Sequence, residues 1–234
     1  MRVLVLIPAF NEAESLPAVI AELRGTLPTV DILVVDDGST DATPAVLAPL
    51  GVRWVRLSQR LGTGAAVRTG LRYANARGYD VVVRIDGDGQ HPAHEIQRVL
   101  GPILDGSADA VLGSRYAKSA AATPPGLRRV SHRLLGALLS VLTGRAVTDP
   151  RSGLWVFGPH ALRLLVEHHP SGYPEPELVL FLSRNHLRFT EVAVRMRERF
   201  AGRTSLTPQR TGAALVRLLL LLVVVPLRAA VGTK

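Results

Sequence analysis

Two carboxylates stand two residues apart where an apolar segment runs into a glycine-rich turn. Asp86 and Asp88 follow the β-branched segment 81–85, and each of them is followed by a glycine. The glycines leave the backbone free to turn, so both carboxylates can converge on one hard cation. A divalent ion held there would bind a diphosphate. An acidic turn without any ligand is the alternative for so short a pattern.

Two further apolar segments end in polar residues. One runs into Asp36 and Asp37, which a glycine and hydroxyl residues follow. The N-terminal segment is halted by Pro8 and leads into polar residues that include Glu12. In an open α/β sheet, ligands bind beyond the carboxyl ends of the strands. The three segment ends therefore predict one shared crevice.

Segments of strand length alternate with segments of helical periodicity along the chain. Strands are expected near residues 2–8, 31–36, 52–57, 80–86, 108–113, 153–157 and 188–194. Helices are expected near residues 14–25, 40–48, 63–77, 93–104, 124–143, 159–168 and 176–186. This alternation predicts an α/β fold with a mostly parallel central sheet flanked by helices.

The 234 residues are 47% hydrophobic, and no linker rich in Ser, Pro or Gly divides them. Residues 1–206 are therefore expected to form one catalytic domain, and residues 207–234 a hydrophobic, membrane-facing helical segment. Only ten uncharged residues separate Arg217 from Arg228, whereas a bilayer span needs about 20. A helix lying at the membrane interface is preferred, and a marginal span stays open.

A net charge of +9 predicts an anionic partner. The arginines of the second half alternate with leucines and not with aromatic residues, which make up 5% of the chain, so a membrane surface is favoured over nucleic acid.

Cysteine is absent. The first apolar segment is too short for a secretory leader because Pro8 stops it. The sequence thus predicts a cytoplasmic protein, peripheral or monotopic at the inner face of the cell membrane.

The segment 127–142 is a second candidate for membrane contact. Its leucines and valines follow helical spacing, and basic residues cluster at its N-terminal end. A helix of this kind suits a phosphate-bearing lipid at a membrane surface. A surface helix whose apolar side packs on the core is the alternative.

Six short motifs occur in order along the chain, at residues 7–12, 35–41, 62–66, 86–92, 113–115 and 148–153. They resemble those of the inverting family 2 glycosyltransferases, and among these the branch of dolichyl-phosphate mannose synthases and polyprenyl-phosphate glycosyltransferases. With a late Arg-x-x-Gly pattern, the resemblance extends to about residue 205. It implies the GT-A fold.

The resemblance implies transfer of a sugar, with inversion, from a nucleotide-diphosphate sugar (GDP-mannose or UDP-glucose) to a polyprenyl or dolichyl phosphate. It places Mg²⁺ or Mn²⁺ on Asp86, Asp88 and Gln90, where the ion offsets the charge of the departing nucleoside diphosphate. The donor-binding residues that it implies are Pro8, Ala9, Glu12, Asp37, Gly64, Asp86, Arg199 and Ser205.

On the acceptor side, the resemblance implies that Asp149 is catalytic together with Asp88. A carboxylate at 149 could act as a general base. A phosphate monoester is largely a dianion at neutral pH, however, so positioning can matter more than base strength. Arg115, with Arg129 and Arg133 behind it, is the candidate for binding the lipid phosphate.

Two other classes of protein remain open. A transferase of the same fold that acts on a soluble or polysaccharide acceptor would not need the basic amphipathic segments. A nucleotide-sugar-binding scaffold would have no reason to keep the carboxylates together. A dinucleotide-binding oxidoreductase is disfavoured because Val67 stands where its third glycine is required. The chain also departs from the family pattern at Trp155, where an arginine is usual.

Overall fold

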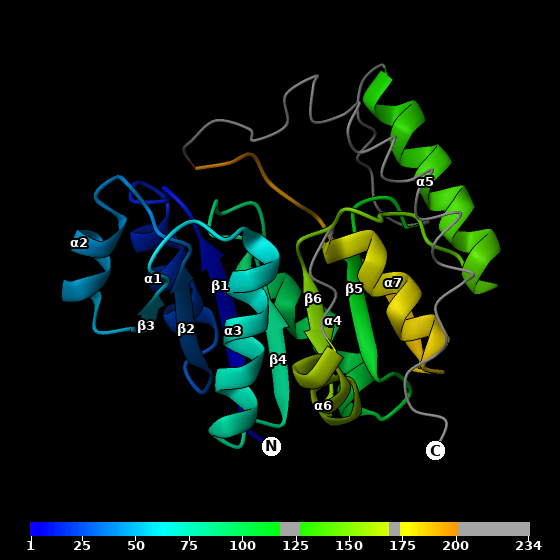
Figure 1. Ribbon diagram of the computed structural model, residues 1–234, viewed down its shortest axis with the longest axis horizontal. Helices are drawn as coiled ribbons and strands as arrows, with labels where there is room; N and C mark the ends of the chain where they lie inside the picture. Colours follow the sequence, from blue (N-terminus) through cyan, green and yellow to red (C-terminus); the bar gives the residue numbers. More distant parts are fainter. Residues whose placement is uncertain (118–126, 169–173, 201–234) are drawn as a thin grey trace.

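The computed structural model describes residues 1–117, 127–168 and 174–200 (Figure 1). The strands are β1 (Val3–Ala9), β2 (Asp31–Asp36), β3 (Arg53–Arg56), β4 (Val81–Arg84), β5 (Ala110–Ser114), β6 (Trp155–Phe157) and β7 (Phe189–Ala193). The helices are α1 (Leu16–Thr26), α2 (Thr43–Leu47), α3 (Thr63–Ala76), α4 (Ala93–Leu104), α5 (Leu127–Thr143), α6 (Pro159–His168) and α7 (Pro174–Arg184), and a 3₁₀ turn, η1 (Ala48–Leu50), follows α2.

The strands form one sheet in the order β3-β2-β1-β4-β6-β5-β7. Strand β6 is antiparallel to β4 and β5, and the remaining pairs are parallel. The expected mostly parallel α/β sheet is therefore confirmed. Because β1, β2, β4, β5 and β7 run in the same direction, their carboxyl ends meet at one edge of the sheet, the upper edge in Figure 1.

Alternate residues of the central strands are buried on opposite faces of the sheet. Leu4 and Leu6 pack on the face covered by α3, α5, α6 and α7. Val5 and Ile7 pack on the face covered by α1, α2 and α4. A sheet covered on both faces needs strands that are apolar throughout, which explains the continuous runs of Val, Leu and Ile in the sequence.

The expected strands and helices are all present, with shifted ends. The helix expected from residue 40 begins at Thr43. The side chain of Asn11 accepts hydrogen bonds from the amides of Thr40 and Asp41, at 2.9 and 3.4 Å, and Asp41 caps the Thr43 amide at 2.9 Å. These bonds hold residues 40–42 in a loop. The hydrophobic segment 207–234, predicted to face the membrane, lies outside the described residues.

Candidate active site

The carboxylates singled out in the sequence lie at the same edge of the sheet. Asp36 ends β2, and Asp37 follows it. Asp86 and Asp88 lie in the turn after β4, which pairs with β1 in the middle of the sheet. The predicted crevice thus has its residues on three neighbouring strands, as the parallel arrangement requires.

Asp86 is paired with a buried arginine at the end of the preceding strand, β4. The Nη2 atom of Arg84 is 2.9 Å from Oδ1 of Asp86, and Nε2 of the buried His91 is 3.8 Å from Oδ2. Burial raises the pKa of the Asp86 carboxyl, but the charge of Arg84 and the contact with His91 outweigh it and hold that pKa well below its usual range. Asp86 is therefore an anion throughout the physiological range.

The pKa of Asp88 is shifted in the opposite direction from that of Asp86. Its carboxylate accepts the amide of Gln90 at 3.0 Å and lies 3.2 Å from Nη2 of Arg199. Burial and the negative charge of Asp86 nevertheless raise the pKa of Asp88 above its usual value. Two carboxylates with opposite shifts, set close together at a strand end, are a common feature of functional sites.

A segment after β7 crosses the turn that carries these carboxylates. The Arg197 amide donates to the carbonyl of Gln90 at 3.1 Å, and the Phe200 amide donates to the carbonyl of Asp88 at 3.1 Å. The Phe200 ring lies over Gly89, where a Cβ would come within 2.2 Å of it. Gly89 also has a φ of +78°, so both the turn and its cover require glycine.

Arg197 fixes this crossing segment from its other side. Its Nε donates to the Gly89 carbonyl at 2.6 Å, and its Nη2 forms an ion pair with Glu22 of α1. Glu22 in turn accepts the Ala93 amide at the start of α4 at 2.9 Å. Sequence reasoning missed Glu22 and Arg197 because they lie far apart in the chain. It also missed Arg84, although a lone arginine in an apolar strand was a usable signal.

The wall formed by β1 and β2 is held by side chain to backbone bonds. The amide of Asn11 donates to Ser39 Oγ at 2.9 Å, and the amide of Glu12 donates to Thr43 Oγ1 at 2.9 Å. Pro8 and Ala9 lie in β1, opposite Val35 and Asp36 of β2. Burial raises the pKa of the Glu12 carboxyl, despite a bond from the Ser15 hydroxyl.

Asp37 binds the loop that opens α3. Its two carboxylate oxygens accept the amides of Leu61 and Gly62, at 2.7 and 2.8 Å. Gly64 lies in the first turn of that helix. Asp37 therefore fixes the N-terminus of this helix at the same edge of the sheet, where its backbone amides favour an anion. The ring of Phe10 and the guanidinium of Arg60, 3.9 Å from its centroid, stack nearby.

Asp149 and Arg115, predicted separately, form one unit. Arg115 donates from Nε and Nη2 to the two oxygens of Asp149, each at 2.7 Å, and from its amide at 3.0 Å. Asp149 is completely buried. Burial lowers the pKa of the Arg115 guanidinium, but its hydrogen bonds to Asp149 have the larger effect, so the net pKa lies above the usual value. Arg115 is therefore charged, and both carboxylate oxygens of Asp149 are occupied in orienting it.

The loop that carries Asp149 also reaches Asp86. A Cβ added to Gly153 would come within 1.9 Å of Oδ2 of Asp86. The loop 149–153 thus connects the Arg115 unit with the carboxylates after β4. Trp155 in β6 is the cross-strand partner of Arg84 in β4. The family pattern usually has an arginine at position 155. In this chain that position is Trp155, and an arginine, Arg84, lies beside it on the neighbouring strand.

Helix α5 carries the other two predicted arginines. Arg133 is exposed, and the neighbouring His132 packs edge-to-face on the Tyr116 ring, with the centroids 5.8 Å apart. Arg129 lies in the same helix, but its side chain is not among those described, and Ser205 lies outside the described residues altogether. The helix also exposes Leu134, by 59%, and Val141, by 81%.

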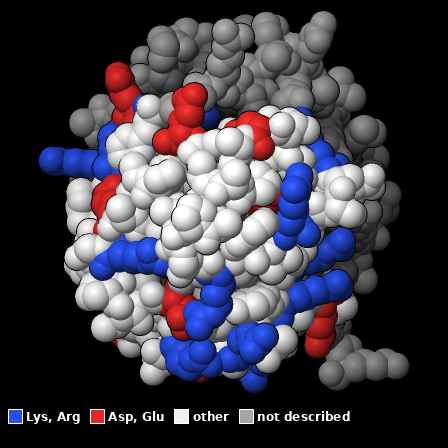
Figure 2. Space-filling view, turned by 90° about the vertical axis from the view of Figure 1, so that its left-hand side faces the viewer, with Lys and Arg blue, Asp and Glu red and all other residues white. Residues whose placement is uncertain are grey.

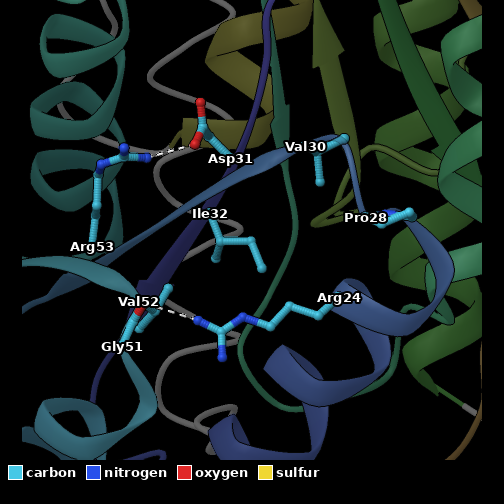
Figure 3. Close-up of a pocket in the computed structure, with 8 residues that line it drawn as sticks. All are labelled: Arg24, Pro28, Val30, Asp31, Ile32, Gly51, Val52 and Arg53. Carbon is cyan, nitrogen blue, oxygen red and sulfur yellow. Dashed lines mark hydrogen bonds and ion pairs between the residues drawn. The ribbon is translucent and has the colours of Figure 1, made fainter.

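Other features of the described residues lie away from the edge of the sheet that carries these carboxylates. A cavity of about 410 Å³ is lined by the end of α1 and the starts of β2 and β3, with Arg24, Asp31 and Arg53 around it (Figure 3). It lies at the end of β2 opposite to Asp36. Figure 2 shows this side of the molecule, with basic side chains mainly in its lower half. Among the described helices, none is both long and apolar enough to cross a bilayer.

Comparison with known proteins agrees with this arrangement. The family described as "Glycosyl transferase family 2" matches residues 4–162. An undecaprenyl-phosphate mannosyltransferase of Micrococcus luteus is 30% identical over 226 residues, covering 92% of each chain. A UDP-N-acetylglucosamine–dolichyl-phosphate N-acetylglucosaminyltransferase of Methanococcus voltae is 30% identical over 210 residues, covering 81% of this chain and 83% of its own.

A solved structure has the same fold. Glucosyl-3-phosphoglycerate synthase from Mycobacterium tuberculosis, in complex with Mn²⁺, UDP-glucose and phosphoglyceric acid, superposes with a TM-score of 0.71 at 25% identity. The match covers 94% of this chain and 78% of that one. The sheet is thus that of the GT-A glycosyltransferases, as the sequence predicted. The chain belongs to glycosyl transferase family 2 and is a glycosyltransferase.

Proposed function

We propose that this glycosyltransferase moves a sugar from a nucleotide-diphosphate sugar to a polyprenyl or dolichyl phosphate, with inversion and with the help of a divalent metal. The observation that carries the proposal is the loop 149–153. It joins Asp86 and Asp88 to the Arg115–Asp149 unit, so that the carboxylates of the donor site and the guanidinium of the acceptor site lie side by side. GDP-mannose and UDP-glucose are the candidate donors.

The donor half has the chemistry that a metal requires. Within the described ranges, no three His, Asp or Glu side chains are grouped as a metal site. Mg²⁺ in enzymes of phosphate chemistry is commonly held by one or two carboxylates and by the substrate phosphates. Asp86, Asp88 and the side-chain oxygen of Gln90 fit that pattern. When bound, the metal offsets the negative charge that develops on the leaving nucleoside diphosphate.

The chain supplies further positive charge to the same leaving group. Arg199 reaches Asp88 from the crossing segment, and a guanidinium fork suits phosphate oxygens. The helix α3 adds backbone amides at its N-terminus, where Asp37 fixes Gly62 and Gly64 follows in the first turn. Pro8, Ala9 and Glu12 form the neighbouring wall for the nucleotide.

In the acceptor half, Arg115 orients the lipid phosphate. Asp149 engages Nε and one Nη2 proton of Arg115, so that Nη1, which forms no hydrogen bond with the described residues, can bind a phosphate oxygen. A phosphate oxygen attacks the anomeric carbon as the bond from that carbon to the diphosphate breaks. The attacking group is already a dianion at neutral pH, so no proton needs to be removed. Asp149 then acts by holding Arg115, and its role as a general base becomes unnecessary.

The membrane side of the proposal rests on α5. This helix exposes Leu134, Val141 and Leu142 together with Arg133, a combination suited to an anionic bilayer surface. The names of the similar lipid-phosphate transferases support a lipid acceptor. We place the enzyme at the cytoplasmic face of the membrane, as a peripheral or monotopic protein. The alternative is a soluble or polysaccharide acceptor, which the phosphoglyceric acid bound by the similar solved structure favours.

The test is a transfer assay with labelled GDP-mannose, UDP-glucose and UDP-N-acetylglucosamine, each offered with a short polyprenyl phosphate. Metal-dependent label in the organic phase from one donor would support the proposal and identify the sugar. Metal-dependent release of nucleoside diphosphate only with a soluble phosphorylated acceptor or a glycan would overturn the lipid half and support the alternative.

A further inference from the structure

A carboxylate on the edge strand β7 reaches the turn that carries Asp149. Glu191 accepts the amide of Thr148 at 2.8 Å, the hydroxyl of Thr148 at 2.5 Å and the amide of Asp149 at 3.3 Å. These three bonds go to two consecutive residues of one turn. Burial raises the pKa of the Glu191 carboxyl, opposed by its bonds to Thr148. Nothing in the motif order pointed to this residue.

The bonds continue from Thr148 to the loop that carries Arg115. The hydroxyls of Thr148 and Ser114 are 2.6 Å apart, and Ser114 Oγ accepts the amides of Tyr116 and Ala117, at 3.2 and 3.1 Å. An ionised Glu191 can only accept, so the Thr148 proton points to Glu191 and the Ser114 proton points to Thr148. One directed chain of bonds thus connects the two loops.

These two loops are the ones that the Arg115–Asp149 pair bridges. Asp149 is held by Glu191 through its amide, and Arg115 lies between Ser114 and Tyr116, whose atoms are fixed by the same chain. Strand β7 pairs with β5 throughout Ala110–Ser114. The Glu191 carboxylate therefore belongs to the strand adjacent to β5, which ends at Ser114, directly before Arg115.

We propose that Glu191 is a positioning residue for the acceptor phosphate: it fixes the turn at 148–149 and thereby the direction of the Arg115 guanidinium. The inference deepens the proposed function and rests on it for the identity of the acceptor. It predicts that Glu191 affects binding of the phosphate acceptor and leaves donor binding unaffected, because none of its bonds reaches Asp86 or Asp88.

The experiment compares Glu191→Ala, Glu191→Gln and Thr148→Val with Glu167→Gln, a control whose side chain is 70% exposed on α6. We measure the KM for a short polyprenyl phosphate, the KM for the donor and the melting temperature. In parallel, the Nε–H resonance of Arg115 is followed by NMR and is assigned from its loss in Arg115→Lys. A guanidinium held by a buried carboxylate keeps this proton protected from exchange.

Glu191→Ala should raise the acceptor KM about 10-fold, the size of effect expected from losing hydrogen bonds to a charged acceptor, and should leave the donor KM unchanged. The Arg115 resonance should broaden or disappear. Glu191→Gln keeps a carbonyl for the two amides and should restore much of both readouts. Thr148→Val should reproduce part of the defect.

An acceptor KM and an Arg115 resonance that stay at wild-type values in both Glu191 variants would overturn the inference, even if the melting temperature fell. Should Glu191→Ala not fold, Thr148→Val decides by the same readouts, because Glu191→Gln is expected to behave much like the wild type. If the wild-type protein itself transfers no sugar to a polyprenyl phosphate, the proposed function fails. The resonance of Arg115 still tests the positioning role in that case.

Discussion

The guanidinium of Arg199 lies 3.2 Å from the carboxylate of Asp88. One of the two carboxylates proposed to hold the metal is thus already paired with a cation of the chain. The crossing segment that carries Arg199 is fixed on the same turn by backbone bonds from Arg197 and Phe200. If the proposed function holds, Arg199 and a metal would compete for one carboxylate until the donor diphosphate provides the arginine with another anion.

Removing this competition should have opposite effects on metal binding and on catalysis. We expect Arg199→Met to raise the affinity of the donor-free protein for Mn²⁺ by about 2- to 5-fold, the range set by a partly exposed ion pair. Turnover should fall because the leaving diphosphate loses a guanidinium. Electron paramagnetic resonance of free Mn²⁺ measures the first effect. Arg195→Met, an exposed change in the same segment, serves as the control and should alter neither quantity.

Asp88→Asn should abolish metal-dependent turnover and also stabilise the protein. An acid whose pKa is raised on folding binds protons more tightly when folded, so stability falls as pH rises through the interval between its unfolded and folded pKa values. Above that interval this cost is fully present in the wild type, and asparagine removes it. We expect a melting temperature higher by roughly 2–4 °C at pH 7, the shift that corresponds to about 1 kcal/mol in a chain of this size.

The same comparison at low pH checks the cause. Once Asp88 is protonated in both the folded and the unfolded state, the cost vanishes and the advantage of the asparagine variant should disappear. Equal melting temperatures at pH 7, or full metal-dependent activity in Asp88→Asn, would contradict the placement of this carboxylate beside Asp86. Circular dichroism at both pH values and the transfer assay provide the two readouts.

The sheet could be predicted because its cause is local. Apolar strand-length segments that end in Asp36, in Asp86 or at Pro8 show both the strands and the edge at which their ends gather. Several of the pairs that shape the site could not be predicted. Arg115 and Asp149 are 34 positions apart, and only the insertion of β6 beside β5 brings their loops together. Charge pairing across such distances leaves no periodic signal in one sequence.

Helix ends were less predictable for a related reason. The start of α2 is set by the side chain of Asn11, which belongs to a different strand end and holds Thr40 and Asp41 out of the helix. Asn11 itself has a φ of +57°, a left-handed conformation that asparagine tolerates better than most residues. The polar residue after β1 was visible in the sequence, but its partner was not.

Gly153→Ala tests the contact between the 149–153 loop and the donor carboxylates. The added Cβ would come within 1.9 Å of Oδ2 of Asp86, so the carboxylate or the loop must move. Because Asp86 is also held by Arg84 and His91, we expect turnover to fall by at least about 100-fold, as small misplacements of reacting groups do. Gly25→Ala in α1 meets no atom within 4 Å and is the matched control. A fully active Gly153→Ala would show that the loop does not approach Asp86.

Asp149→Asn separates the two roles left open for this carboxylate. If Asp149 were the general base, the variant would lose kcat, and its residual activity would rise with pH. If Asp149 holds Arg115, as the bonds from Nε and Nη2 indicate, the main defect is a higher KM for the phosphate acceptor, with no new dependence on pH. An amide can accept one of the two side-chain bonds but repels the other donor, so we expect an increase of about 10-fold, the size of a lost charge-assisted bond.

Arg115→Lys should give a similar acceptor defect, because lysine replaces the fork with a point charge. A loss confined to kcat in Asp149→Asn, with the acceptor KM unchanged in both variants, would restore the general base and remove the positioning role.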